Sequence, residues 1–213
     1  KVIPLLKLGT GFFVNQILYL IVTHSSIILV VQFFGPNDVT IFNLSHRYVT
    51  ISSMLYTMIL TPFLTAFTEA YTKKEFDWIV NTMKKINLIC IVFSFFSLFM
   101  VLIYNWFFNL WVGEDIVIPL NLIIVMTITT LIKMWSSTYT LFLNGIGKIR
   151  LQFYLLIFQG VLFIPLSFIF YKLQFGLSSI VIAQMILSLI SITFFVVQYK
   201  KIVNLKAYGI WDK

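Results

Sequence analysis

Charged residues are scarce in this sequence of 213 residues, and acidic residues are the scarcest of them. Asp and Glu together number 7 and Lys and Arg 15, so charged residues make up 10% of the chain, against about 25% in soluble domains. Hydrophobic residues make up 60%, and the mean hydropathy is +0.99. A soluble globule of this size could not bury so much apolar surface. The composition therefore excludes an ordinary soluble enzyme and a disordered chain, and it predicts an all-α integral membrane protein.

The sequence also has little of what catalysis and covalent cross-linking require. Its one cysteine, Cys90, excludes an intrachain disulfide. It contains no His-Glu-x-x-His zinc motif, no Gly-x-Ser-x-Gly elbow and no Cys/His cluster. The glycine-rich turn before Lys148 lacks the Walker spacing and the Ser or Thr that follows the lysine of a phosphate loop. We therefore expect no enzymatic activity, no metal and no cofactor.

Six apolar stretches are long enough to cross a membrane, which takes roughly 20 residues as a helix. Turn-forming residues such as those of the Gly-Pro-Asn-Asp sequence at 35–38 separate these stretches, and the short links make neighbouring helices antiparallel. The sequence predicts a single transmembrane domain over 1–213, a bundle of six transmembrane helices. The expected spans are 10–33, 40–66, 86–110, 118–142, 152–171 and 177–199.

The longest connection, 67–85, has a pattern of its own. Phe76, Ile79, Val80 and Met83 recur at helical spacing among charged residues. Such spacing predicts an amphipathic helix lying on the cytoplasmic membrane surface. A topological connector and a docking or gating element are both compatible with this pattern.

The basic residues are distributed unequally between the two sets of connections. One set carries twelve of the 15 basic residues, whereas the other carries only Lys172 with Asp38, Glu114 and Asp115. Because cytoplasmic loops are enriched in Lys and Arg, both termini are predicted to be cytoplasmic. The twelve are Lys1, Lys7, Lys73, Lys74, Lys84, Lys85, Lys148, Arg150, Lys200, Lys201, Lys206 and Lys213.

The two remaining cations, Arg47 and Lys133, fall inside expected spans. A charge at that depth costs at least about 2.5–3.5 kcal/mol on insertion scales, so such residues pair with an acid, extend to the interface or face water. Every acidic residue falls in an expected loop or tail, which leaves neither cation an obvious partner. Extension toward the interface remains open for both. The sharper interpretation is a water-filled cavity that binds a phosphate or carboxylate.

Polar side chains on the first two expected spans favour such a cavity. Asn15, Tyr19, Thr23 and Ser26 share one helical stripe, and Asn43 lies one turn before Arg47. Hydrogen bonding between helices would explain each of them as well. We therefore name two kinds of candidate: polar residues of a binding cavity and polar residues that hold helices together. Gln159, Gln184 and Asn121 look isolated in the sequence, which favours the second kind for them.

Several short sequences follow one another along nearly the whole chain. They include Phe34-Gly35-Pro36, Asn43-Leu44-Ser45-His46-Arg47-Tyr48, Thr61-Pro62-Phe63, Leu110-Trp111-Val112-Gly113 and Asn144-Gly145-Ile146-Gly147-Lys148-Ile149-Arg150. Taken in this order, they resemble the second half of O-antigen (Wzx-type) polysaccharide flippases, which belong to the multidrug/oligosaccharidyl-lipid/polysaccharide exporter superfamily. No single one of these sequences is decisive, and the ordered set carries the resemblance.

The resemblance implies a fold of two six-helix lobes around a central cavity, with this chain as the second lobe. Because the chain begins at Lys1, without a Met, we expect it to be part of a longer protein that supplies the other lobe. The implied activity is the flipping of undecaprenyl-diphosphate-linked oligosaccharide across the bacterial inner membrane by alternating access. The implied partners are this lipid-linked oligosaccharide, membrane lipids, the N-terminal lobe and the polysaccharide polymerase machinery, with no nucleic acid.

The resemblance also assigns roles to residues. The first two helices of each lobe are thought to line the cavity, which here gives Asn15, Tyr19, Thr23, Ser26, Asn43 and Arg47 as substrate-binding residues. Lys133 matches no family motif and is a candidate only because it is an intramembrane cation. Two alternatives stay open: a cation-coupled multidrug exporter of the same superfamily, which would need intramembrane carboxylates, and a membrane-embedded glycan-modifying enzyme, which would need a positioned base.

Overall fold

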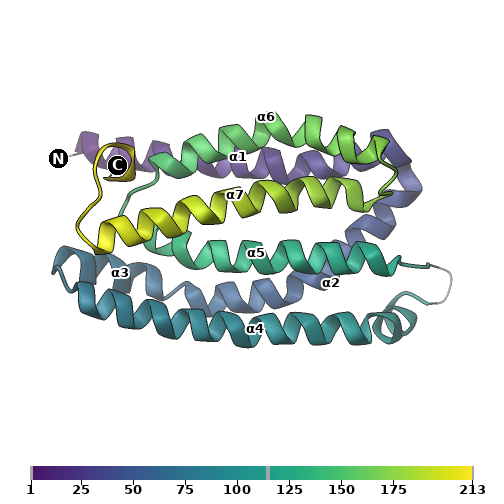
Figure 1. Cartoon of the computed structure of the whole chain (residues 1–213), viewed down its shortest axis with the longest axis horizontal. Helices are drawn as coiled ribbons and strands as arrows, with labels where there is room; N and C mark the ends of the chain where they lie inside the picture. The colour runs from purple at the N-terminus through teal and green to yellow at the C-terminus, as the bar shows by residue number, and fades with distance from the viewer. Residues whose placement is uncertain (1, 114–115, 213) are drawn as a thin grey trace.

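The computed structural model describes residues 2–113 and 116–212, except for the side chains of 2–8, 11–12 and 22–23. It is an elongated bundle of helices that run roughly along one axis (Figure 1). Helices account for 87% of the chain, which confirms the all-α prediction. Their bounds are α1 Val2–Phe34, α2 Pro36–Leu60, α3 Phe63–Thr72, α4 Phe76–Trp111, α5 Leu120–Gly145, α6 Arg150–Lys172 and α7 Ser178–Val203, followed by the short 3-10 helix η1 Gly209–Asp212.

The helices match the expected spans in order. Helices α1, α4, α5, α6 and α7 are each long and apolar enough to cross a membrane, and α2 with α3 forms a sixth span if the two are counted together. Those two helices meet at a bend of 42°. The bend lies at Pro62, which has no backbone N–H to continue the helix. The chain is therefore a multi-pass membrane protein with an all-α bundle fold.

The segment 67–85 differs from its prediction, because it is not a separate amphipathic helix. It comprises the end of α3, a turn at Lys73–Glu75 and the first turns of α4. Lys74 adopts a left-handed conformation with φ of 61°, and the Glu75 N–H donates to the Ala70 carbonyl at 2.9 Å, which is how a Schellman turn ends a helix. The hydrogen bond from Lys73 to Glu69 raises the pKa of Lys73 at this exposed turn.

The apolar face of the same segment packs against protein. Phe67 and Ile79 are fully buried and Met83 nearly so, and they belong to a core cluster that also contains Phe142 and Leu143 of α5. An amphipathic pattern shows only that one face avoids water. Here the buried face meets a neighbouring helix, and the expected helix at the membrane surface is corrected accordingly.

Two apolar clusters form the core, one toward each end of the bundle. The first surrounds Tyr48, Phe108 and Ile123, near the end where α1 turns into α2. The second surrounds Phe67 and Phe142, near the end that holds the α3–α4 turn. Between them α5 packs on α7, α2 and α4, and α7 packs on α6. Helices α1 and α2 diverge from their shared turn, since α1 runs beside α6 whereas α2 runs beside α4 and α5 (Figure 1).

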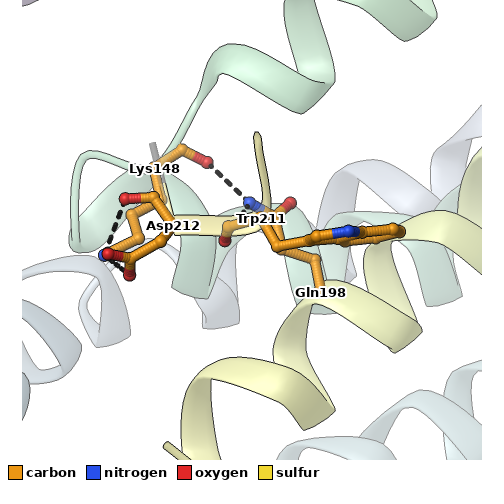
Figure 2. Close-up of polar contacts among 4 residues, drawn as sticks. All are labelled: Lys148, Gln198, Trp211 and Asp212. Carbon is orange, nitrogen blue, oxygen red and sulfur yellow. Dashed lines mark hydrogen bonds and ion pairs between the residues drawn. The ribbon is translucent and has the colours of Figure 1, made fainter. Parts of the chain in front are cut away.

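The residues after α7 fold back onto the bundle. The Lys148 ammonium, in the α5–α6 turn, pairs with the Asp212 carboxylate and donates to the Asp212 carbonyl at 3.0 Å (Figure 2). Gln198 of α7 donates from Nε2 to the carbonyls of Lys148 at 3.4 Å and Trp211 at 3.2 Å. Lys201 lies over the Trp211 ring at 4.0 Å from its centroid. The C-terminal segment thus ties the α5–α6 turn to α7.

Candidate functional site

Three adjoining hollows surround Lys133 in the middle of the bundle. Tyr19 of α1 and Lys133 of α5 line all three. We call the first the His46 chamber, about 220 Å³, and the second the amide chamber, about 400 Å³. A small pocket of about 40 Å³ between α1, α5, α6 and α7 adjoins both. Together they form the Lys133 cavity, which lies in the space where α1 and α2 diverge.

Lys133 is held by an amide rather than by a carboxylate. Its ammonium donates to Gln184 Oε1 of α7 at 3.2 Å, and Gln184 in turn donates from Nε2 to the Ser26 hydroxyl of α1. Among the residues that the structure describes, those that line the three hollows include no Asp or Glu. A neutral amide orients a cation without neutralising it, so the positive charge remains available to an anion.

The His46 chamber lies on the α2 side of Lys133. Its wall combines His46 and the hydroxyl residues Thr50 and Ser53 of α2 with Thr129 and Thr130 of α5. The His46 imidazole can donate or accept a hydrogen bond, and the hydroxyl oxygens can accept one. The chamber is therefore suited to polar or anionic groups, with Lys133 as its fixed charge.

The amide chamber lies on the other side of Lys133, toward the α5–α6 turn. It is lined by Asn15 and Gln16 of α1, Asn144 of α5, and Gln152 and Gln159 of α6, together with hydroxyl residues. The side-chain oxygens of Asn15, Asn144 and Gln152 are buried and have no hydrogen-bond partner among the described protein groups. Gln159, by contrast, donates to the Ser191 hydroxyl. Buried polar atoms are nearly always paired, so three unpaired oxygens around one chamber are a distinctive feature.

The structure places the residues predicted from sequence in three groups. Asn15 and Tyr19 line the Lys133 cavity, and Ser26 contacts it through Gln184. The side chain of Thr23 lies outside the described residues. Arg47 and Asn43 lie apart from the cavity and are considered next.

Arg47 lies on the exposed face of α2, in a shallow groove separate from the Lys133 cavity. The groove and the His46 chamber share Thr50, Ser53 and Thr57, so the two adjoin along α2. Asn43 is half-buried on the same helix and is not among the residues that line the cavity. Arg47 is thus a neighbour of the candidate site and not a part of its wall.

Sequence reasoning missed several contributors to this site, among them Asn144 and Gln152 of the amide chamber. Gln159 and Gln184 were predicted to hold helices together, and they do hydrogen-bond to neighbouring helices, but both also line the pocket around Lys133. His46 was not nominated, although it precedes Arg47 in the sequence. Gln184 and Lys133 are 51 residues apart, so no local spacing could have paired them.

Five Ser and Thr hydroxyls on α2 and just past its end are satisfied by backbone carbonyls of the same stretch of chain. Each donates to a backbone carbonyl three or four residues earlier, as Ser and Thr do in apolar surroundings. These bonds are Ser45 to Ile41 at 2.7 Å, Thr50 to His46 at 2.7 Å, Ser53 to Thr50 at 2.9 Å, Thr57 to Ser53 at 2.7 Å and Thr61 to Thr57 at 2.9 Å. The polar wall that α2 gives to the cavity therefore needs no partner on another helix.

Among residues 2–113 and 116–212, no cluster of three or more His, Cys, Asp or Glu side chains could hold a metal ion. Cys90 is buried and unbonded to another cysteine. The chemical features of the cavity are thus a cation, a histidine, hydroxyls and amides. Such a set binds polar and anionic groups.

Comparison with known proteins agrees with the resemblance inferred from sequence. The chain is 27% identical over 162 residues to a protein of Yersinia pseudotuberculosis whose name assigns it to O-antigen export. The match covers 74% of this chain and 37% of the relative, so the chain spans well under half of the relative's length. No family model and no solved structure matches the chain. The predicted resemblance to O-antigen export proteins of the membrane is confirmed.

Proposed function

We propose that this chain is the second six-helix lobe of a transporter that flips undecaprenyl-diphosphate-linked oligosaccharide across the bacterial inner membrane by alternating access. The similarity to an O-antigen export protein supports a polysaccharide-export transporter. The observation that carries the finer proposal is Lys133, an intramembrane cation in a polar cavity whose described wall contains no carboxylate. A diphosphate is the anion of such a substrate, and a desolvated cation binds it strongly.

The arrangement of charge supports an exporter of anions over an exporter of cations. A cavity with a fixed positive charge and neutral hydrogen-bonding groups repels cationic drugs. The exposed Arg47 lies on the face of α2 next to the cavity, where the N-terminal lobe would close the central space. Arg47 then meets the diphosphate during entry, and Lys133 holds it within the lobe.

The orientation and partners follow from the same proposal. The end of the bundle that holds the α3–α4 and α5–α6 turns carries most of the basic loop residues, which supports placing it, with both ends of the chain, in the cytoplasm. The partners are the N-terminal lobe, the lipid-linked oligosaccharide, surrounding lipids and the polymerase that extends the exported units. Rocking of one lobe against the other would expose the cavity to each side in turn.

A deletion strain tests the proposal directly. Lipid-linked oligosaccharide in the inner membrane and polysaccharide on the cell surface are measured together. We expect the lipid-linked intermediate to accumulate and the surface polymer to disappear, with both restored by the intact gene. Unchanged polymer together with new sensitivity to cationic drugs would instead identify a multidrug exporter.

Arg47 provides a more local test in the intact protein. We expect Arg47→Ala to abolish most surface polymer and Arg47→Lys to retain much of it, because positive charge is what the groove supplies. Lys172→Ala, a change in an exposed cation at the end of α6 that is not among the residues lining the groove, serves as the matched control. Normal polymer in the alanine variant at normal expression would contradict a role for this charge.

A further inference from the structure

The three unpaired amide oxygens of the amide chamber have no explanation in the packing of the bundle. Asn15 is 5% exposed, and its Oδ1 is buried without a partner among the described side chains and backbone, as are Asn144 Oδ1 and Gln152 Oε1. Leaving such an atom unpaired costs as much as its lost hydration. Each of three helices places one such unpaired oxygen at the same chamber, since Asn15 lies on α1, Asn144 on α5 and Gln152 on α6. Each of these oxygens carries the same unfavourable free energy.

Local structure fixes two of these amides. Asn144 and Gln152 flank the α5–α6 turn, which is closed by bonds from the Gly147 N–H to the Asn144 carbonyl at 3.1 Å and from the Lys148 N–H to the Leu143 carbonyl at 2.9 Å. The turn is also tied to α7 and to the C-terminal segment by Gln198 (Figure 2). The side-chain amides of Asn144 and Gln152 therefore lie beside a turn that hydrogen bonds hold in one conformation. A binding site requires side chains that are held in place in this way.

The chemistry of the chamber selects one kind of ligand. Amide oxygens accept hydrogen bonds and amide nitrogens donate them, which complements hydroxyl and acetamido groups. Ser136, Ser137 and Thr140 add hydroxyls to the wall, and Lys133 is the one charged residue in the described part of its lining. A carboxylate placed here would compete with the diphosphate for that single cation.

We propose that the amide chamber is the carbohydrate subsite of the transporter, and that it takes a neutral, hydroxyl-rich or N-acetylated sugar next to a diphosphate at Lys133. The proposal rests on the proposed function and adds to it the class of sugar and its place. Sugar hydroxyls donate to Asn15, Asn144 and Gln152, and the amide nitrogens donate to ring and acetamido oxygens. The lipid chain stays outside the chamber.

Binding to the purified intact protein tests this with three defined probes. These are polyprenyl diphosphate, the same lipid carrying a neutral N-acetylhexosamine disaccharide, and the same lipid carrying a disaccharide that contains a uronic acid. We expect the neutral sugar to raise affinity about tenfold or more over the sugar-free lipid, as two or three net hydrogen bonds would. The uronic-acid lipid gains less.

Asn15→Leu and Gln152→Leu each remove the hydrogen-bonding group at nearly the same side-chain size. We expect each variant to lose several-fold of the affinity gained from the neutral sugar while binding sugar-free lipid as before. Asn87→Leu is the matched control, because Asn87 Oδ1 on α4 is also buried and unpaired but Asn87 does not line the Lys133 cavity. Thermal melting of each variant verifies its fold, and Gln152→Leu alone decides the test if Asn15→Leu does not fold.

The outcomes separate this proposal from the proposed function. If sugar-free lipid binds through Lys133 but the neutral sugar adds nothing, the carbohydrate subsite is overturned and the transporter proposal stands. If Lys133→Gln leaves the binding of sugar-free lipid unchanged, the anion site itself fails. A uronic acid that binds better than the neutral sugar would overturn the proposed sugar class.

Discussion

The two sides of α5 use similar polar side chains in opposite ways. On the side that faces α4, where Ser52 and Tyr56 of α2 also lie, the Tyr56 hydroxyl is 2.6 Å from Thr138 Oγ1 and the Ser97 hydroxyl donates to Ser52 at 2.7 Å. On the side that faces α1, α6 and α7, and within the described part of the chain, Lys133 has one neutral partner and Asn144 Oδ1 has none. Hydroxyls and amides in a membrane bundle thus serve either helix contact or ligand binding. A group whose hydrogen bonds are made within the protein serves helix contact, whereas a group left without a protein partner is available to a ligand.

The two sides of α5 also differ in how closely their side chains pack. Tyr56 and Thr138 are fully buried, and Tyr56 belongs to a continuous apolar cluster with Cys90 and Phe93. The opposite side holds the largest of the hollows around Lys133, at about 400 Å³. Close packing specifies one arrangement of helices, whereas the hollow side leaves room for a ligand. Stability and function should therefore respond to mutations on different sides of one helix.

Lys133→Met sharpens this comparison most strongly. Removing the cation should lower transport about 10- to 100-fold, the value of a hydrogen bond to a charged group. The melting temperature should stay the same or rise, because an apolar residue of similar length replaces a partly buried charge without a counter-ion. Surface polysaccharide and thermal melting of the purified protein measure the two effects. Full transport by the Lys133→Met variant would contradict the assignment of this side of α5 to ligand binding.

The pair Tyr56 and Thr138 tests the other side. We expect the Tyr56→Phe, Thr138→Val double-mutant cycle to give a coupling free energy of about 0.5–1.5 kcal/mol in unfolding. Transport should remain near normal as long as the variants fold. Denaturation of the four proteins in detergent measures the coupling, and surface polysaccharide measures transport. A transport defect without loss of stability would break the distinction between the two sides.

The C-terminal brace should give the smallest effect. Asp212 is about half exposed, at 49%, and Lys148 is 14% exposed, so solvent screens their ion pair and Asp212→Asn should cost less than about 1 kcal/mol. The cost should shrink further in high salt. Melting curves at two salt concentrations are the measurement. A larger, salt-independent loss would mean that the carbonyl contacts of Gln198 depend on this pair.

The sequence was informative about the spans and much less so about the site. Long apolar runs bounded by turn residues are local patterns, and they predicted the order of the helices. The segment 67–85 was misassigned because its apolar face looks the same whether it meets lipid or α5. Within the cavity, Tyr19 and Asn15 were predicted from their shared stripe on α1, because such a stripe is visible in sequence.

The remaining site residues depend on packing between distant helices. Gln184 reaches Lys133 across 51 residues, and its role as a cavity residue appears only when α7 packs on α5. His46 gave no signal, since its neighbour Arg47 carried the more unusual charge. Arg47 itself lies on the outer face of α2, because helix rotation, which depends on packing, decides which side of a helix faces inward.

The hydroxyls of α2 have one more consequence. Since Ser45, Thr50, Ser53, Thr57 and Thr61 all bond to carbonyls of their own helix, the helix takes these bonds with it wherever it moves. A rotation or tilt of α2 strands none of these donors, and bonds of this kind make a helix easier to bend. Resistance to such a motion comes from the fit of side chains and from the hydrogen bonds of Tyr48, Ser52 and Tyr56 to α4 and α5. The cavity face of α2 is thus free to shift without losing these five bonds, and the face toward α4 is the one that holds the helix in place.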